Sequence, residues 1–150
     1  MISDLADVIA ETAGKKVVFT NGVFDILHAG HVTYLRQARD LGDCLVVAIN
    51  SDDSVRGLSK GSHRPVNTQQ DRAVVLAALK PVDFVVVFDE PTPERVLSEL
   101  RPDIHTKGGD YAADELPESK LVESYGGQVV ILPFVPGRST TQILQKLSEQ

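Results

Sequence analysis

The chain has little of what marks proteins of oxidising or membrane compartments. It contains one cysteine in 150 residues, Cys44, so no disulfide can form within it. No cluster of cysteine and histidine has the spacing of a zinc site. No apolar run is long enough for a transmembrane helix or a signal peptide. From these absences we predict a cytoplasmic protein with no membrane contact.

Positive charge is also scarce. Lys and Arg number 15 against 21 Asp and Glu, which gives a formal net charge of -6. Such a surface repels polyanions, so we expect no nucleic-acid partner. Two common phosphate-binding motifs, GxGxxG and GxxxxGK[ST], are missing as well. An anionic ligand must therefore be held by a local set of donors.

The hydrophobic residues, 42% of the chain, form five short runs rich in β-branched side chains, and a segment with helical spacing follows each run. The runs are "KKVVFTNG", "CLVVAINS", "DFVVVFDE", "DIHTKGG" and "QVVILPF". Their continuous hydrophobicity is typical of strands that are covered on both faces. We predict a single α/β domain over residues 1–150: a Rossmann-like, doubly wound, five-stranded parallel sheet of order 3-2-1-4-5 with helices on both faces.

Local signals set the expected boundaries. Asn67 is a candidate N-cap for the helix that follows it, and residues 51–66 are expected to form a long loop. In the predicted order, strands 1 and 4 are neighbours where the winding reverses. Ligands of such sheets bind beyond the carboxyl ends of the strands at that point. The loops after Thr20 and Thr106 therefore become the candidate site.

The segment "FTNGVFDILHAGH" follows the first predicted strand. We expect Gly22 to adopt unusual backbone angles and Gly30 to keep the start of the next helix open. His28 and His31, three residues apart, lie on one face of a helical turn, where their imidazoles and the helix N-terminus can converge on an anion. The alternative for an isolated pair is that His28 caps the loop and His31 is an interior histidine. Metal binding is less favoured, because no third ligand has a useful spacing.

Three further segments offer donors at the same edge of the sheet. The segment "TKGGDY" exposes backbone at its paired glycines, although a plain turn is an alternative. Three cations, Lys60, Arg64 and Arg72, lie in or just after the long loop and suit a phosphate, the alternative being a solvated basic loop. Hydroxyls at the start of the last helix, in "GRSTTQIL", can hold a phosphate or simply cap the helix.

Ser59, His105, His63 and Cys44 are not expected to take part in the chemistry. The segment "GLSKG" around Ser59 matches a hydrolase nucleophile motif but does not directly follow a strand. His105, inside a predicted strand, is expected to make a structural hydrogen bond. His63 is expected to be exposed, and Cys44 to be a small buried side chain.

The four segments, in this order, resemble the small nucleotidyltransferases of the cytidylyltransferase-like superfamily, whose hallmark is an HxGH motif after the first strand. The resemblance extends from about Lys16 to Leu147. It is closest to adenylyltransferases acting on sugar phosphates. It implies transfer of AMP from ATP to a sugar 1-phosphate, expected to be heptose 1-phosphate, with release of pyrophosphate and with Mg²⁺ as cofactor.

The resemblance also implies the roles of individual residues. His28, His31 and Lys60 would be catalytic, and Lys60, Arg64 and Arg72 would contact substrate phosphates. Asp25 would brace the loop or help to place Mg²⁺, and no protein metal site is expected. The residues expected to border the nucleotide are Thr20, Asn21, Gly22, Phe24, Asp25, Gly30, Lys107, Gly108, Gly109, Asp110, Arg138, Ser139 and Thr140.

Two other functions stay open. A cytidylyltransferase acting on glycerol phosphate or another polyol phosphate would use the same chemistry, but such enzymes carry an arginine where this chain has Phe134. A nucleotide-binding regulatory module without turnover is the alternative from a different class. Relatives commonly pair, so a homodimer is expected. Because this chain carries no kinase part, a separate sugar kinase and phosphatase are expected to supply its substrate.

Overall fold

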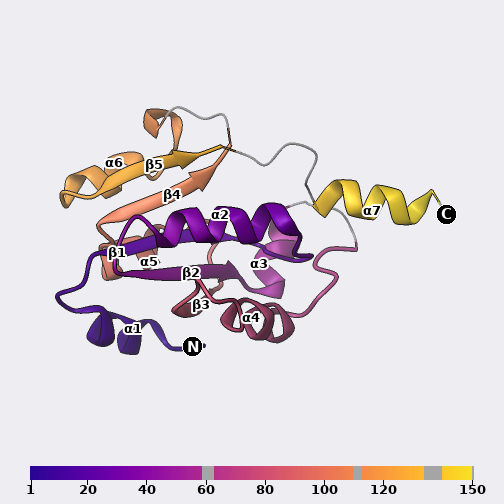
Figure 1. Cartoon of the computed structure of the whole chain (residues 1–150), viewed down its shortest axis with the longest axis horizontal. Helices are drawn as coiled ribbons and strands as arrows, with labels where there is room; N and C mark the ends of the chain where they lie inside the picture. The colour runs from indigo at the N-terminus through magenta and orange to yellow at the C-terminus, as the bar shows by residue number, and fades with distance from the viewer. Residues whose placement is uncertain (59–62, 110–112, 134–139, 150) are drawn as a thin grey trace.

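The computed structural model describes residues 1–58, 63–109, 113–133 and 140–149. Within them the strands form one parallel sheet of order β3-β2-β1-β4-β5 (Figure 1), so the predicted order is confirmed. The strands are β1 (Val17–Gly22), β2 (Cys44–Asn50), β3 (Phe84–Phe88), β4 (Ile104–Gly108) and β5 (Gln128–Leu132). All residues of β2 are buried, as its continuous apolar run predicts for a strand inside a covered sheet.

Helices cover both faces of the sheet, as expected for a doubly wound fold. They are α1 (Leu5–Thr12), α2 (Ala29–Arg39), α3 (Asp52–Gly57), α4 (Gln69–Ala77), α5 (Glu94–Leu100), α6 (Ser119–Ser124) and α7 (Thr140–Ser148), with a short 3₁₀ helix η1 (Ala113–Glu115). Apolar residues of α1, α5 and α6 pack on one face, and those of α2 and α4 pack on the other. None of the described helices is long and apolar enough to cross a lipid bilayer.

Helix α2 follows β1 directly in the chain and so begins at the end of the sheet where β1 finishes. In Figure 1, α7 projects beyond the sheet at this same end. The site expected from the sequence therefore lies at one end of the molecule, with its elements held on a buried sheet.

Three local expectations are corrected. Thr68, not Asn67, caps α4, because its hydroxyl accepts a hydrogen bond from the Asp71 amide. The expected loop over residues 51–66 contains α3, which Ser51 caps through its hydroxyl. Helix α1 was not among the predicted elements. Its buried residues, Leu5, Val8 and Thr12, stand at helical spacing, so the periodic signal was present in the sequence and was overlooked.

Candidate functional site

Strands β1 and β4 pair side by side, with Phe19 opposite His105, and so define the point where the winding reverses. A set of buried hydroxyls ties α2 to both strands. The Tyr34 hydroxyl, from α2, lies 2.8 Å from the Thr20 hydroxyl and donates to that of Thr106 at 2.9 Å. Burial raises the pKa of Tyr34. These contacts fix where α2 begins relative to the strand ends.

Thr20 was predicted to border the nucleotide, and its hydrogen bonds with Tyr34 and Thr106 correct this role. Its side chain is 1% exposed and its hydroxyl donates to the Thr106 carbonyl oxygen. Thr20 therefore does not present its side chain to a ligand. It holds β1, β4 and α2 together beneath the site instead.

The start of α2 is capped by its two histidines in a reciprocal arrangement. The Gly30 amide donates to Nδ1 of His28 at 3.0 Å, and the His28 amide donates to Nδ1 of His31 at 3.2 Å. The ring centroids lie 4.1 Å apart. Both histidine residues are partly exposed. The expectation that the histidines lie together at a helix N-terminus is confirmed, and His28 is also the N-cap.

This capping fixes the chemistry of the pair. A neutral imidazole that accepts at Nδ1 carries its proton on Nε2, so each ring offers an Nε2 donor. Burial, and after it the charge of His28, lower the pKa of His31 to about 4. His31 is therefore neutral at pH 7. The amides of residues 28 and 30 are already used, so an anion here is bound by the imidazoles rather than by these amides.

The ring of Phe24 packs against the imidazole of His31. Phe24 is 9% exposed, and its ring centroid lies 5.6 Å from that of His31. The unusual backbone angle predicted for Gly22 occurs at Phe24 instead, where φ is 50°. Gly22 is needed for another reason, since a Cβ there would lie 3.0 Å from the Phe24 ring. Phe24 was expected to border the nucleotide, but it packs mainly in the core below the histidines.

Asp25 braces the loop that leads to α4. Its fully buried carboxylate accepts hydrogen bonds from Arg64 Nε and from the amides of Val66 and Asn67, each at 2.8 Å. The Asn67 side chain returns a bond to the Asp25 carbonyl oxygen at 2.7 Å. Both carboxylate oxygens are thus occupied. Of the two roles that the sequence left open, this geometry favours bracing over binding of Mg²⁺.

Arg72 is a correction to the predicted phosphate contacts. Its guanidinium is buried and donates to the carbonyl oxygens of Val23, Asn50 and Asn67 and to the carboxylate of Asp52. These acceptors come from the ends of β1 and β2, the start of α3 and the loop before α4. Arg72 therefore joins the elements behind the site and does not present its charge to a ligand.

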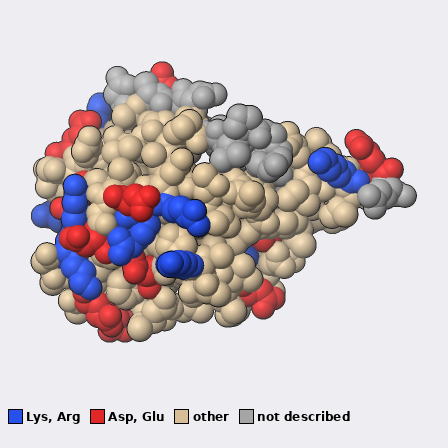
Figure 2. Space-filling view, viewed as in Figure 1, with Lys and Arg blue, Asp and Glu red and all other residues tan. Residues whose placement is uncertain are grey.

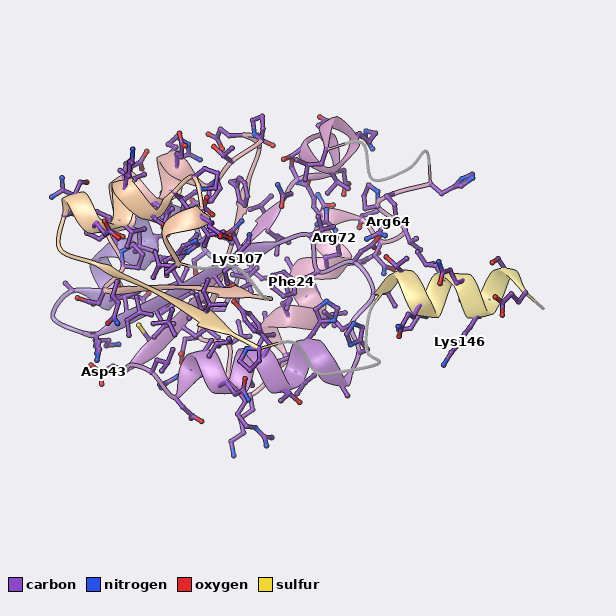
Figure 3. All side chains as sticks on the ribbon, turned by 90° about the horizontal axis from the view of Figure 1, so that it is seen from above. Phe24, Asp43, Arg64, Arg72, Lys107 and Lys146 are labelled. Carbon is purple, nitrogen blue, oxygen red and sulfur yellow. The ribbon has the colours of Figure 1, made fainter. Side chains whose placement is uncertain are left out.

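Arg64 is held by an ion pair inside the protein and is also partly exposed to solvent. Its Nε is held by Asp25, and its side chain is 15% exposed. In Figure 3, Phe24, Arg64 and Arg72 lie toward the end of the sheet from which α7 projects, and Asp43 marks the opposite end. Arg64 is thus placed at the same end as the histidines.

The face of the molecule in Figure 2 shows where charge gathers. Lys and Arg there are concentrated over the half away from α7, and Asp and Glu lie among them. Mixed charges of this kind suit ion pairing rather than attraction of a polyanion. This distribution agrees with the expectation that an anion needs a local set of donors.

Of the remaining predicted residues, some are described by the structure and others lie outside its described part. Lys107 and Gly108 end β4, and Gly109 follows with φ 129°, donating its amide to the Leu132 carbonyl oxygen at 3.0 Å. Asn21 lies near the end of β1, and Oδ1 of its side chain is buried. Thr140 begins α7. Four predicted residues lie outside the described part of the chain: Lys60, Asp110, Arg138 and Ser139.

Sequence reasoning missed two residues that make buried polar contacts, Tyr34 and Glu118. Tyr34 follows His31 by three residues and so lies on the same helix face, which was the available signal. The expected structural bond of His105 is confirmed, because its Nε2 lies 3.3 Å from Glu118 Oε1. Its partner, 13 residues away, had no local signal.

Fold and site together define a class: a doubly wound α/β protein with paired imidazole donors at a helix start, in the place where such sheets bind nucleotides. Residues 19–145 match the model of the cytidylyltransferase-like family. The chain belongs to this family.

Individual relatives agree with this assignment. The chain is 57% identical over 145 residues to the D-beta-D-heptose 1-phosphate adenylyltransferase of Bordetella bronchiseptica, covering 97% of this chain and 90% of that protein. It is 56% identical to part of the bifunctional protein HldE of Cronobacter sakazakii, of which it spans 29%.

Among solved structures, a lipopolysaccharide core biosynthesis protein from Thermoplasma volcanium has a TM-score of 0.66 and 33% identity, covering 81% of this chain and 98% of that one. A pantothenate synthetase from Thermus thermophilus has a TM-score of 0.65 at 16% identity, covering 90% of this chain and 62% of that one, and so shares the fold.

Replacement of Arg72 tests its structural role. We expect Arg72→Met to lower the free energy of unfolding by about 3–5 kcal/mol, since it leaves buried acceptors without their donor. Urea unfolding measures this loss. Arg56→Met is the control, because Arg56 pairs with Asp53 on the surface, and its cost should stay within about 0.5 kcal/mol. Equal effects of the two substitutions would contradict the assignment.

The lowered pKa of His31 makes stability depend on pH. The unfolded chain binds a proton at this residue near pH 6.5, whereas the folded chain binds it only near pH 4. Its contribution is therefore complete above pH 6.5 and is lost as the pH falls toward 4. We expect the wild type to lose more stability than His31→Asn between pH 7 and pH 4.5, measured by urea unfolding. Parallel losses would show that His31 is not held neutral.

Proposed function

We propose that this chain is a sugar-phosphate adenylyltransferase that transfers AMP from ATP to D-glycero-D-manno-heptose 1-phosphate, giving ADP-heptose and pyrophosphate. The observation that carries the proposal is the reciprocally capped histidine pair at the start of α2, beside the paired ends of β1 and β4. The choice of substrates is supported by the 57% identity to an enzyme named for this activity.

The reaction needs positioning and charge stabilisation rather than a covalent intermediate. A phosphate oxygen of the sugar phosphate attacks the α-phosphorus of ATP in line. The bond from that phosphorus to the bridging oxygen breaks, and pyrophosphate leaves with the electron pair. Negative charge on the phosphate oxygens must be met by donors that are already in place. His28 and His31 supply Nε2 donors whose orientation is fixed by their Nδ1 contacts.

We assign the acceptor phosphate to the loop between α3 and α4. Arg64 donates to Asp25 through Nε, and its guanidinium has further N–H donors on the terminal nitrogens. These donors can meet a phosphate without breaking the bracing contact. Lys60 is assigned to the same loop by its place in the sequence and by the family resemblance.

The nucleotide is assigned to the remaining strand ends. Asn21, Lys107, Gly108, Gly109 and Asp110 would border the base and ribose. The triphosphate would lie against the start of α2 and the residues that begin the last helix, Arg138, Ser139 and Thr140. These placements rest on the resemblance and on the position of β4 beside β1.

Magnesium is proposed to enter with ATP. Among the described residues, no group of three or more His, Cys, Asp or Glu could hold a metal ion, and Asp25 has both oxygens occupied. Mg²⁺ keeps most of its water and is commonly bound through substrate phosphates. The chain's own donors would therefore hold the phosphates, and the ion would neutralise part of their charge. The cytoplasmic location, the homodimer and the separate upstream enzymes stay predictions.

A substrate panel tests the function directly. Pyrophosphate release is measured with ATP and CTP, each with heptose 1-phosphate, glycerol phosphate and other sugar phosphates. We expect turnover with ATP and heptose 1-phosphate. Preference for CTP with glycerol phosphate would favour the polyol-phosphate alternative. Binding of ATP with no release for any acceptor would favour the regulatory module.

Substitution of the histidines tests the chemistry. Removing one preorganised donor typically costs about 100-fold to 1,000-fold in turnover. We expect His28→Ala and His31→Ala each to lose at least that much in kcat while remaining folded by circular dichroism. Val75→Ala, an exposed change on α4, is the control and should keep wild-type kcat. Near-normal kcat in either histidine variant would refute the assignment.

A further inference from the structure

A buried imidazole on β4 and a buried carboxylate just before α6 lie in contact. His105, on β4, is fully buried, and its ring packs 5.4 Å from that of Phe19. Its Nε2 lies 3.3 Å from Oε1 of Glu118, whose side chain is 10% exposed. Glu118 directly precedes α6. The pair therefore joins β4 to the residue that directly precedes α6.

The direction of this hydrogen bond follows from burial. Nδ1 of His105 is buried and has no partner among the described residues, so a proton there would be unsatisfied. The proton is therefore on Nε2, which donates to the carboxylate. This bond is the largest cause of the lowered pKa of Glu118, with a further contribution from the charge of Lys107. Glu118 is thus an ionised acceptor at pH 7.

The contact spans the segment that carries the paired glycines. His105 lies four residues before Gly109, and Glu118 lies nine residues after it. Near its end the segment has local bonds: the Ser119 hydroxyl donates to the Ala113 carbonyl oxygen, and the Ser119 amide to that of Leu116. These bonds fold the end of the segment on itself. The contact between His105 and Glu118 fastens it to the sheet.

A purely apolar contact would fill this space at less cost. Burying an imidazole and a carboxylate requires desolvation that a hydrogen bond only partly repays, and well-packed apolar side chains are often as stable. A directional bond, however, fixes the position of the segment more narrowly than packing does. The pair thus suits a part of the chain that must be placed accurately.

We propose that His105 and Glu118 are positioning residues that hold residues 113–117 against β4 and thereby set the affinity for ATP. They act through Gly109, directly after the end of β4, and touch no reacting atom. The proposal rests on the proposed function, which places Gly109 beside the base and ribose.

The test separates positioning from stability by comparing steady-state constants. We expect Glu118→Ala to raise the KM for ATP about tenfold, which matches the loss of one charge-assisted hydrogen bond. The KM for heptose 1-phosphate and kcat should stay within about twofold of wild type. Glu118→Gln keeps an acceptor for Nε2 and should recover most of the affinity. Glu123→Ala, an exposed change on α6, is the matched control and should match the wild type.

A double variant removes the effect of instability. His105→Leu alone leaves Glu118 buried without its donor and should lower stability. His105→Leu combined with Glu118→Leu should regain stability in urea unfolding, because no polar group is then left unpaired. We expect this stable double variant to keep the raised KM for ATP. A stable double variant with wild-type KM would overturn the proposal, and so would equal increases in both KM values.

Hydrogen exchange gives a readout that needs no substrate. In the unliganded protein, Glu118→Ala and the double variant should exchange the amides of residues 113–116 faster than wild type, whereas Glu123→Ala should not. If wild type fails in the substrate panel but exchange responds in this way, the proposed function is wrong and the fastening of the segment stands. Unchanged exchange would overturn the proposal whatever the panel shows.

Discussion

The hydrogen bonds from two backbone amides to two imidazole nitrogens are the constraint on which the site depends. They cap α2 and, in the same contacts, decide which nitrogen of each neutral imidazole carries the proton. Because Nδ1 is occupied in both rings, Nε2 is the donor, and the orientation is set before any ligand arrives. A helix start with ordinary Ser or Asp caps would offer an anion the helix dipole but no directed side-chain donor. Here the same residues perform both tasks.

The cations of this acidic chain show how a phosphate site can be made with little positive charge. Arg72 is buried inside the protein. Its guanidinium donates to backbone carbonyl oxygens at the ends of β1 and β2 and in the loop before α4. Arg64 is held by Asp25 on one side, which leaves its terminal nitrogens for other partners. These contacts within the protein hold Arg64 in place and so reduce the motion of its remaining N–H donors. A few fixed donors stabilise charge better than many mobile ones, because no reorganisation is needed during the reaction.

The sheet could be predicted from the sequence because its signals are local. Continuous apolar runs identify buried strands, and the rule on crossovers then restricts their order. The positions of Thr20 and Arg72 could not be predicted in this way. Motif spacing showed that both are near the site, but their side chains point into networks whose members lie up to 86 positions away in the sequence. Glu118 was missed for the same reason, because no local sequence pattern indicates that it pairs with His105, 13 residues away.

Several of the buried polar contacts lie at the carboxyl ends of the strands or fasten segments that leave them. The hydroxyls of Thr20, Tyr34 and Thr106 fix α2, the Asp25 carboxylate fixes the loop before α4, and His105 with Glu118 fastens the segment after β4. Each buries polar groups that apolar packing would replace at lower cost. The two apolar clusters, by contrast, pack along both faces of the sheet. This division matches the demand of phosphoryl transfer, for which donors must be held within about 0.5 Å of a productive geometry. The fold is therefore stabilised by its apolar faces, while directional bonds define where the reacting groups can meet.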